Sequence, residues 1–272
     1  MHNVKKSFFA YRMLFFEKPS EHQFRKTMRD IVLLVLILLA FRAFSYQHYL
    51  IPSGSMIPTL NVGDFVMVNK ASYGYSRYSL PWHVPLIKGK ILMTQTPKMG
   101  DVIAFVNPKN TKMDYIKRCV GLPGDTIKIR QGKLYINGNE CQYKKIADYE
   151  TIDFSGKQVE YHCYEETLPN GVTHVMMRTE DSQDALLTDP RNNTEEFVVP
   201  EDHYFAMGDN RNQSQDSRYP NPGFVPINYI WARGELICFS VDFSFKGNKC
   251  NPLTWYKFKI KPRWSHIGKR IS

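Results

Sequence analysis

The sequence has no C-x-x-C pair among its five cysteines, and this absence excludes a zinc ribbon. We expect no metal site and no other cofactor. Because the number of cysteines is odd, at least one thiol has no partner within the chain. Cys141 and Cys163 flank a polar stretch and would pair in an oxidising compartment, but five free thiols are an equally good prediction.

Acidic residues are absent from residues 246–272, which carry eight of the 36 lysines and arginines. Residues 1–30 carry seven more against three acids, so residues 31–245 have a net charge of −2 although the whole chain has +10. The positive charge therefore lies at the two ends, and a basic groove for nucleic acid is not expected. Basic segments beside an apolar one instead favour a surface of anionic phospholipid.

Long hydrophobic runs are lacking as well. Residues 31–41 are eleven consecutive apolar residues, whereas a spanning helix needs ~20. Arg42 ends the run, but its side chain can snorkel to an interface that Tyr46 and Tyr49 would suit. We therefore predict a transmembrane helix over residues 28–46. A signal peptide and a buried core helix are the alternatives, and the missing A-x-A motif argues against the signal peptide.

The distribution of charge around this helix predicts its orientation. Arg25, Lys26 and Arg29 precede the apolar run, and no Lys or Arg follows the predicted helix until Lys70. The positive-inside rule then makes residues 1–27 a basic cytoplasmic segment and places residues 47–272 outside.

Short apolar runs separated by turn signals fill the rest of the chain. Examples are FVMV at 65–68, DVIAFV at 101–106 and LICFSV at 236–241. This spacing predicts a mainly β fold, with an antiparallel β catalytic core. Residues 140–198 are more polar and irregular, and we expect a β-ribbon subdomain inserted at residues 127–200.

Residues 51–60, IPSGSMIPTL, carry two prolines and a glycine directly after the predicted helix. Such a rigid loop can hold the hydroxyl of Ser55 in one orientation and leave backbone N–H groups free, as acyl transfer requires. Ser-Gly-Ser is also ordinary turn chemistry, so the loop alone does not establish a nucleophile.

Residues 114–120, DYIKRCV, are predicted as a strand, and alternation puts Tyr115, Lys117 and Cys119 on one face. A lysine between apolar neighbours is partly desolvated, which lowers its pKa from about 10.4 toward the ~7–8 that suits a general base. A surface lysine on an edge strand is the plain alternative.

A third segment, GDNRNQSQDSR at 208–218, is dense in short polar side chains that hydrogen-bond locally. By itself it is a solvated loop. It also offers carboxylates and arginines that could pair within the loop or with Arg118.

The three segments, in this order, resemble the motifs of the bacterial type I signal peptidases, or leader peptidases. The nucleophile motif reads PSGSMIPTL here, the lysine motif DYIKRCVGLPGD and the third motif GDNRNQSQDSRYPNPGFVP. A membrane span that ends just before the serine motif is also the family's arrangement. The resemblance implies a membrane-bound serine endopeptidase that removes N-terminal signal peptides from secretory preproteins.

The resemblance also implies roles for single residues. Ser55 is the implied nucleophile and Lys117 the implied general base. Ser53 is the implied hydroxyl partner of the Ser55 N–H in the oxyanion hole, and Ser214 the hydroxyl that orients Lys117. Two ion pairs are implied beneath the site: Asp216 with Arg218, and Asp209 with Arg118.

Ile51, Pro52, Tyr115 and Ile116 resemble the walls of two shallow pockets. Those pockets accept small residues, typically alanine, one and three positions before the cut. The implied enzyme is a monomer in the bacterial inner membrane, with its catalytic domain on the periplasmic or other extracytoplasmic side. Its partners are signal peptides and membrane phospholipid.

The chain departs from the family pattern at Cys119, Asn212 and Gln213 and in the longer link at residues 219–222, but not at the Ser/Lys pair. Three alternative hypotheses for the function remain. A histidine-dependent hydrolase would use a residue such as His48, although no G-x-S-x-G motif is present. The others are a self-cleaving repressor-type Ser/Lys protease and a catalytically silent, membrane-anchored binding module.

Overall fold

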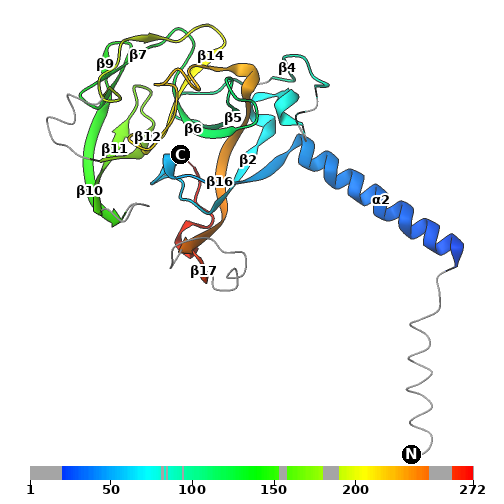
Figure 1. Ribbon diagram of the computed structural model, residues 1–272. Helices are drawn as coiled ribbons and strands as arrows, with labels where there is room; N and C mark the ends of the chain where they lie inside the picture. The colour runs from blue at the N-terminus through cyan, green and yellow to red at the C-terminus, as the bar shows by residue number, and fades with distance from the viewer. Residues whose placement is uncertain are drawn as a thin grey trace, which may run out of the picture. The chain divides into compact units, whose positions relative to one another are not determined.

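The computed structural model describes residues 20–80, 83, 85–93, 95–152, 158–179, 190–244 and 259–271, and its strands dominate the described chain (Figure 1). The chain divides into two compact units after Arg42. The mainly β prediction is confirmed, and every pairing between named strands is antiparallel.

Helix α2, Glu21–Phe44, contains the apolar run 31–41. Its start is fixed by a capping box: Ser20 Oγ accepts the Gln23 N–H at 3.2 Å, and the Gln23 side chain accepts the Ser20 N–H at 3.2 Å. The helix begins earlier than predicted and ends before Tyr46, which opens the first strand instead. In the part of the chain that the structure describes, no helix has the length and apolarity needed to span a membrane.

The main sheet has eight strands, in the order β1-β2-β16-β5-β6-β14-β15, and β17 pairs with β16. The predicted strands at 65–68, 101–106 and 114–120 all lie in this sheet, and the run 236–241 lies within β16. The bounds are β1 Tyr46–Leu50, β2 Asp64–Asn69, β5 Val102–Val106, β6 Asp114–Gly121, β14 His203–Met207, β15 Val225–Pro226, β16 Ile230–Ser244 and β17 Lys259–Pro262.

Strand β5 explains how the core forms around the centre of this sheet. All five of its residues are buried, and they alternate between two apolar clusters. Val102, Ala104 and Val106 join one cluster, and Ile103 and Phe105 join the other. The adjacent strand β6 is therefore held between packed layers from its third residue onward, and this fixes the position of the lysine motif.

Three smaller sheets complete the described chain. A two-stranded sheet pairs β3, Tyr75–Ser76, with β4, Lys90–Ile91. A four-stranded sheet has the order β13-β7-β8-β9, with Ile127 and Ile129 buried by strict alternation along β7. Its strands are β13 Phe197–Val198, β7 Thr126–Arg130, β8 Lys133–Ile136 and β9 Asn139–Glu140.

The third small sheet, β10-β11-β12, is a long antiparallel ribbon (Figure 1). Its strands are β10 Gln142–Ile152, β11 Gln158–Thr167 and β12 Thr173–Thr179. The sequence of residues 140–198 is irregular, but the predicted β-ribbon is present, and Tyr161, Cys163 and Met177 form a small buried cluster that its polar sequence concealed. That residues 127–200 are an inserted subdomain stays a prediction.

Cysteine pairing is settled for the described residues. Cys119, Cys141, Cys163 and Cys238 are all free, so the option of a bridge between Cys141 and Cys163 is not realised. Cys250 lies outside the described residues.

Candidate active site

The serine loop, residues 51–60, follows strand β1 and contains one turn of 3₁₀ helix, Gly54–Met56. Its first residue is tied to the start of β2, because the Ile51 N–H donates to the Asp64 carbonyl at 2.8 Å and the Ile51 carbonyl accepts from the Gly63 N–H, just before that strand, at 3.0 Å. Met56 is completely buried beneath the turn. The loop therefore holds the Ser55 side chain, which is 8% exposed, in a fixed place.

Lys117 lies in the middle of β6, opposite Ile103 of β5. Its Nζ donates a hydrogen bond of 2.5 Å to Ser55 Oγ, although 62 residues separate the two in the chain. The ammonium also lies 5.5 Å from the ring centroid of Tyr115, the neighbour on the same strand face. The predicted alternation thus places the lysine as expected and brings it to the predicted nucleophile.

The electrostatics of Lys117 suit a general base. Burial lowers the pKa of Lys117 to about 8, because an ammonium ion loses solvation there. The carboxylates of Asp216 and Asp209 oppose this decrease in the pKa, and the guanidinium of Arg218 adds to it. Near neutral pH a useful fraction of the amine is therefore unprotonated and able to accept a proton from Ser55.

The two ion pairs implied beneath the site are both present. Arg118 contacts Asp209 through two hydrogen bonds of 2.9 and 2.8 Å. Arg218 contacts Asp216 in the same way, at 2.8 and 2.9 Å. Burial alone would raise the pKa of each carboxyl group, but the adjacent arginine outweighs burial and leaves both pKa values below their usual range.

Ser214 is buried beside these two ion pairs. Within the described residues its Oγ makes no hydrogen bond of normal geometry. The hydroxyl lies near enough to Asp216 to help lower the pKa of that carboxyl group. No hydrogen bond joins Ser214 to Lys117 in the described structure, so its orienting role stays a prediction.

Gly208 lies directly against both active-site serines. A Cβ atom on Gly208 would clash with the Ser214 side chain and would lie 2.5 Å from the Ser55 carbonyl oxygen. The backbone of the 208–218 loop can approach Ser55 this closely only because residue 208 has no side chain.

The ribbon supports the 208–218 loop from the other side, and sequence reasoning missed this contact. The Met177 N–H of β12 donates to the Asp209 carbonyl at 2.9 Å, and the Arg211 N–H donates to the Met177 carbonyl at 2.9 Å. On the inner side of the loop, the Asn210 N–H donates to the Ser55 carbonyl at 3.1 Å. The loop is therefore clamped between the ribbon and the turn that carries Ser55.

A buried ionic cluster reinforces the same junction. Glu166 of β11 accepts hydrogen bonds from Arg211, one of them at 3.0 Å, and from Tyr143 at 2.5 Å. His174 Nε2 lies 3.0 Å from Glu166 Oε2. Burial would raise the pKa of Glu166, but Arg211 and His174 hold it far below its usual value. Only Arg211 belongs to a motif, so the sequence offered no signal for Glu166 or His174.

The predicted pocket walls differ in exposure. Ile51 is 1% exposed and Ile116 is 6% exposed, and both lie in the main apolar cluster. Pro52 is exposed and Tyr115 half-buried. Side chains this deeply packed can bound a shallow depression from below, whereas Pro52 and Tyr115 offer open surface.

The histidine-dependent alternative finds no support in the described residues. Ser55 Oγ has Lys117 at 2.5 Å and Ser53 Oγ at 3.5 Å as its hydrogen-bond partners. His48 is exposed on β1 and pairs with Met67 of β2.

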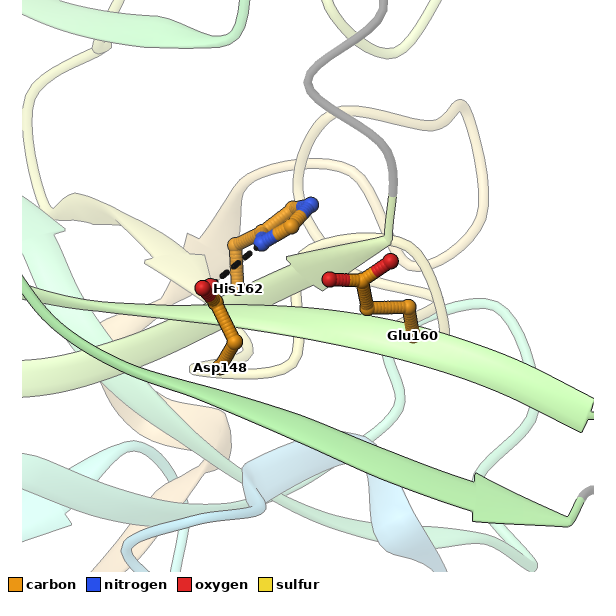
Figure 2. Close-up of side chains that lie close together, drawn as sticks. All are labelled: Asp148, Glu160 and His162. Carbon is orange, nitrogen blue, oxygen red and sulfur yellow. Dashed lines mark hydrogen bonds and ion pairs between the residues drawn. The ribbon is translucent and has the colours of Figure 1, made fainter.

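A second group of titratable side chains lies on the ribbon. Asp148, Glu160 and His162 have potential metal-ligand atoms within 4.8 Å of one another (Figure 2). Asp148 already accepts hydrogen bonds from His162 at 2.6 Å and from Lys145 at 2.9 Å, and both acids are exposed. The carboxylate of Asp148 is thus paired locally, and we assign no metal to this group.

Comparison with known proteins places the chain among peptidases. Residues 24–239 match the family model described as signal peptidase, peptidase S26. The chain is 36% identical to signal peptidase I of Rickettsia massiliae (strain Mtu5) over 235 residues, which is 86% of each protein. It is 37% identical to signal peptidase I of Rickettsia akari (strain Hartford) over 216 residues, which is 79% of each.

A solved structure is also similar, that of a signal peptidase I from Enterococcus faecalis V583. The match has 28% sequence identity and a TM-score of 0.28, and it covers 51% of this chain and 97% of the other. At that TM-score the likeness does not bear on the fold.

Proposed function

The chain belongs to the signal peptidase family, peptidase S26, and is a serine peptidase, and we propose that Ser55 and Lys117 are its catalytic pair. The observation that carries this proposal is the hydrogen bond of 2.5 Å between Lys117 Nζ and Ser55 Oγ in a buried site. Its proposed activity is removal of N-terminal signal peptides from secretory preproteins.

In the proposed mechanism, unprotonated Lys117 accepts the proton of the Ser55 hydroxyl as Oγ attacks the scissile carbonyl carbon. The tetrahedral intermediate carries its negative charge on the former carbonyl oxygen. The Ser55 N–H and the Ser53 hydroxyl are the proposed donors to that oxyanion. Protonated Lys117 then gives its proton to the leaving amine, and the C–N bond breaks to leave an ester on Ser55.

Hydrolysis of the ester repeats the same steps with water. Lys117 accepts a proton from the attacking water molecule, a second tetrahedral intermediate forms, and its collapse returns the proton to Ser55 Oγ. A lysine with a pKa of about 8 suits both directions of transfer, because neither protonation state is strongly disfavoured at neutral pH.

We further propose that cleavage follows small residues at the first and third positions before the cut. The buried side chains of Ile51 and Ile116 would form the floor of the two depressions, and Pro52 and Tyr115 their rims. A shallow apolar floor favours alanine because a larger side chain would find no depth to fill.

The membrane part of the proposal rests on sequence. Apolar residues 31–41 lie within helix α2, beside arginines and lysines that suit a negatively charged inner leaflet. We propose residues 28–46 as the membrane anchor, with residues 1–27 in the cytoplasm and the catalytic domain, residues 47–272, acting as a monomer on the extracytoplasmic face of the bacterial inner membrane. The active site would then meet the end of a signal peptide close to the phospholipid surface.

Incubation of purified protein with a secretory precursor tests the proposal directly. Sequencing of the new N-terminus should locate a cut after a small-x-small motif. Ser55→Ala and Lys117→Ala should each abolish the cut, while Lys128→Ala, which removes an exposed lysine on β7, should leave it unchanged. Normal processing by Ser55→Ala or Lys117→Ala would refute the assignment of Ser55 and Lys117 as the catalytic pair. A cut at another kind of sequence would refute the proposed preference for small residues.

A further inference from the structure

Asn210 makes two hydrogen bonds from the 208–218 loop to the turn that carries Ser55. Its side-chain Nδ2 donates to the Gly54 carbonyl at 3.1 Å, and its backbone N–H donates to the Ser55 carbonyl at 3.1 Å. Asn210 is fully buried. Two successive carbonyl groups of the nucleophile's turn are thus held by one residue that does not touch the reacting hydroxyl.

The contact with Gly54 has a geometric consequence for Ser55. The peptide bond between these residues is trans, since the cis bonds of the described chain precede Pro58 and Pro222. In a planar trans peptide the C=O and N–H groups point in opposite directions. A donor that fixes the Gly54 carbonyl therefore also fixes the direction of the Ser55 N–H.

Within the described residues, no hydrogen bond uses the Ser55 N–H, so it can serve a substrate. Ser55 lies in the first turn of the 3₁₀ helix Gly54–Met56, where N–H groups have no carbonyl partner within the helix. The Gly54 carbonyl is held from two sides, because the Ile57 N–H also donates to it, at 3.2 Å. The peptide plane is fixed, and its N–H is left available.

We propose that Asn210 is a positioning residue for the oxyanion hole: its amide group sets the peptide plane whose N–H binds the tetrahedral intermediate. The inference rests on the proposed function, since it assumes that Ser55 is the nucleophile. Asn210 acts through the backbone of Gly54 and Ser55 and does not contact the substrate.

The ribbon holds Asn210 in place, so the orientation is built into the fold. Asn210 forms a parallel β-bridge with Met177 of β12. Its side-chain Oδ1 accepts the Gln213 N–H at 3.3 Å, and the Gln213 amide donates to the Tyr161 hydroxyl of β11 at 2.6 Å. Preorganised donors of this kind need no rearrangement when charge develops in the transition state.

A merely structural role is the competing explanation, because any buried amide needs partners. The two explanations differ in what they affect. Loss of a structural contact lowers stability and weakens every ligand alike. Loss of oxyanion positioning lowers kcat and weakens tetrahedral adducts, while the substrate's ground state binds as before.

Two variants of Asn210 test the proposal in the full-length protein. Asn210→Asp keeps the Oδ1 acceptor and removes the Nδ2 donor, and Asn210→Ala removes both without adding charge. Asn212→Asp is the matched control, because it makes the same change two residues away, where the Asn212 side chain accepts the Thr179 N–H of β12. Circular dichroism and thermal melting establish which variants are folded, and either folded variant suffices.

The measurements are kcat and KM on a precursor peptide and the inhibition constant of a peptide aldehyde, which forms a tetrahedral adduct with the serine. We expect kcat to fall about 10- to 100-fold, less than loss of the donor itself would cause, with KM nearly unchanged. The inhibition constant of the aldehyde should rise by the same factor. Binding of the matching uncleavable peptide and the pH profile of Asn210→Ala should not change.

Wild-type kcat in a folded Asn210 variant would overturn the inference. So would a loss that appears in KM, or one that Asn212→Asp reproduces. Failure of the proposed function is recognised separately, because Ser55→Ala would then retain activity. If Ser55→Ala is inactive and Asn210→Ala is normal, only the positioning role is wrong.

Discussion

Replacement of Gly208 by alanine should inactivate the site by displacing Ser55. The added Cβ would lie 2.5 Å from the Ser55 carbonyl oxygen, whereas real Cβ atoms essentially never approach a neighbour closer than 3.0 Å. The backbone at Ser55 or at residue 208 must therefore move by at least about 0.5 Å. Moving the Ser214 side chain would relieve its own clash with the new Cβ but not the clash with Ser55, because the obstructing Ser55 atom belongs to the main chain.

The expected loss of activity follows from the geometry of the dyad. Ser55 Oγ and Lys117 Nζ are 2.5 Å apart, and a misplacement of about 1 Å at a reacting group can cost about 100-fold in rate. We expect kcat of Gly208→Ala to fall at least about tenfold, with stability lowered by about 1–3 kcal/mol from overpacking.

The assay combines steady-state kinetics on a precursor peptide with urea unfolding. Gly234→Ala is the control, because a Cβ on Gly234 of β16 would meet its nearest neighbours at 3.4 and 3.5 Å, which is ordinary contact. Wild-type kcat in a folded Gly208→Ala enzyme would refute the argument that Gly208 is required for close approach. Equal losses in both variants would refute it as well.

Three further outcomes are expected. The proposed mechanism needs unprotonated Lys117, and burial lowers the pKa of Lys117 to about 8, so kcat/KM should rise with pH and level off above that value; a profile set near pH 6.5 would indicate a histidine instead. Glu166→Gln should lower the free energy of unfolding, measured in urea, by about 3–5 kcal/mol, because it leaves the buried Arg211 without its ion-pair partner. Glu140→Gln is the control and should change this free energy little, because the pair of Glu140 with Lys133 is exposed. The pKa values of Asp209 and Asp216 are lower in the folded protein than in the unfolded chain. Their contribution to stability is therefore present above about pH 4 and is lost as the pH falls further. Melting temperatures measured from pH 7 to pH 3 should decrease steeply at the acidic end.

The positions of strands and of the lysine were accessible from sequence because both depend on local periodicity. Alternation along β6 predicts that Lys117 lies among apolar neighbours, and burial follows from the all-apolar strand β5 beside it. The pairing of Lys117 with Ser55 joins residues 62 positions apart, and only the family resemblance suggested it.

The residues that support the site could not be predicted from the sequence, because their contacts depend on the register between distant strands. Glu166 lies opposite His174 in the β11–β12 pairing, and this register buries both beside Arg211. Along the chain, Glu166 sits in a polar stretch typical of an exposed strand. The bridge between Met177 and Asn210 likewise joins two distant segments through backbone atoms, which leave no trace in the side-chain pattern.

The backbone contacts between β12 and the 208–218 loop make the two a single unit of local unfolding. The amide protons of Met177 and Arg211 are hydrogen-bonded across this junction, so both become exposed to solvent exchange only when the strand and the loop separate. Such an opening also removes the β-bridge that supports Asn210, whose side chain bonds to the serine loop on its other side. The population of the open form, read from amide hydrogen exchange at Met177, therefore measures how often the loop that carries Asn210 loses its support from the ribbon.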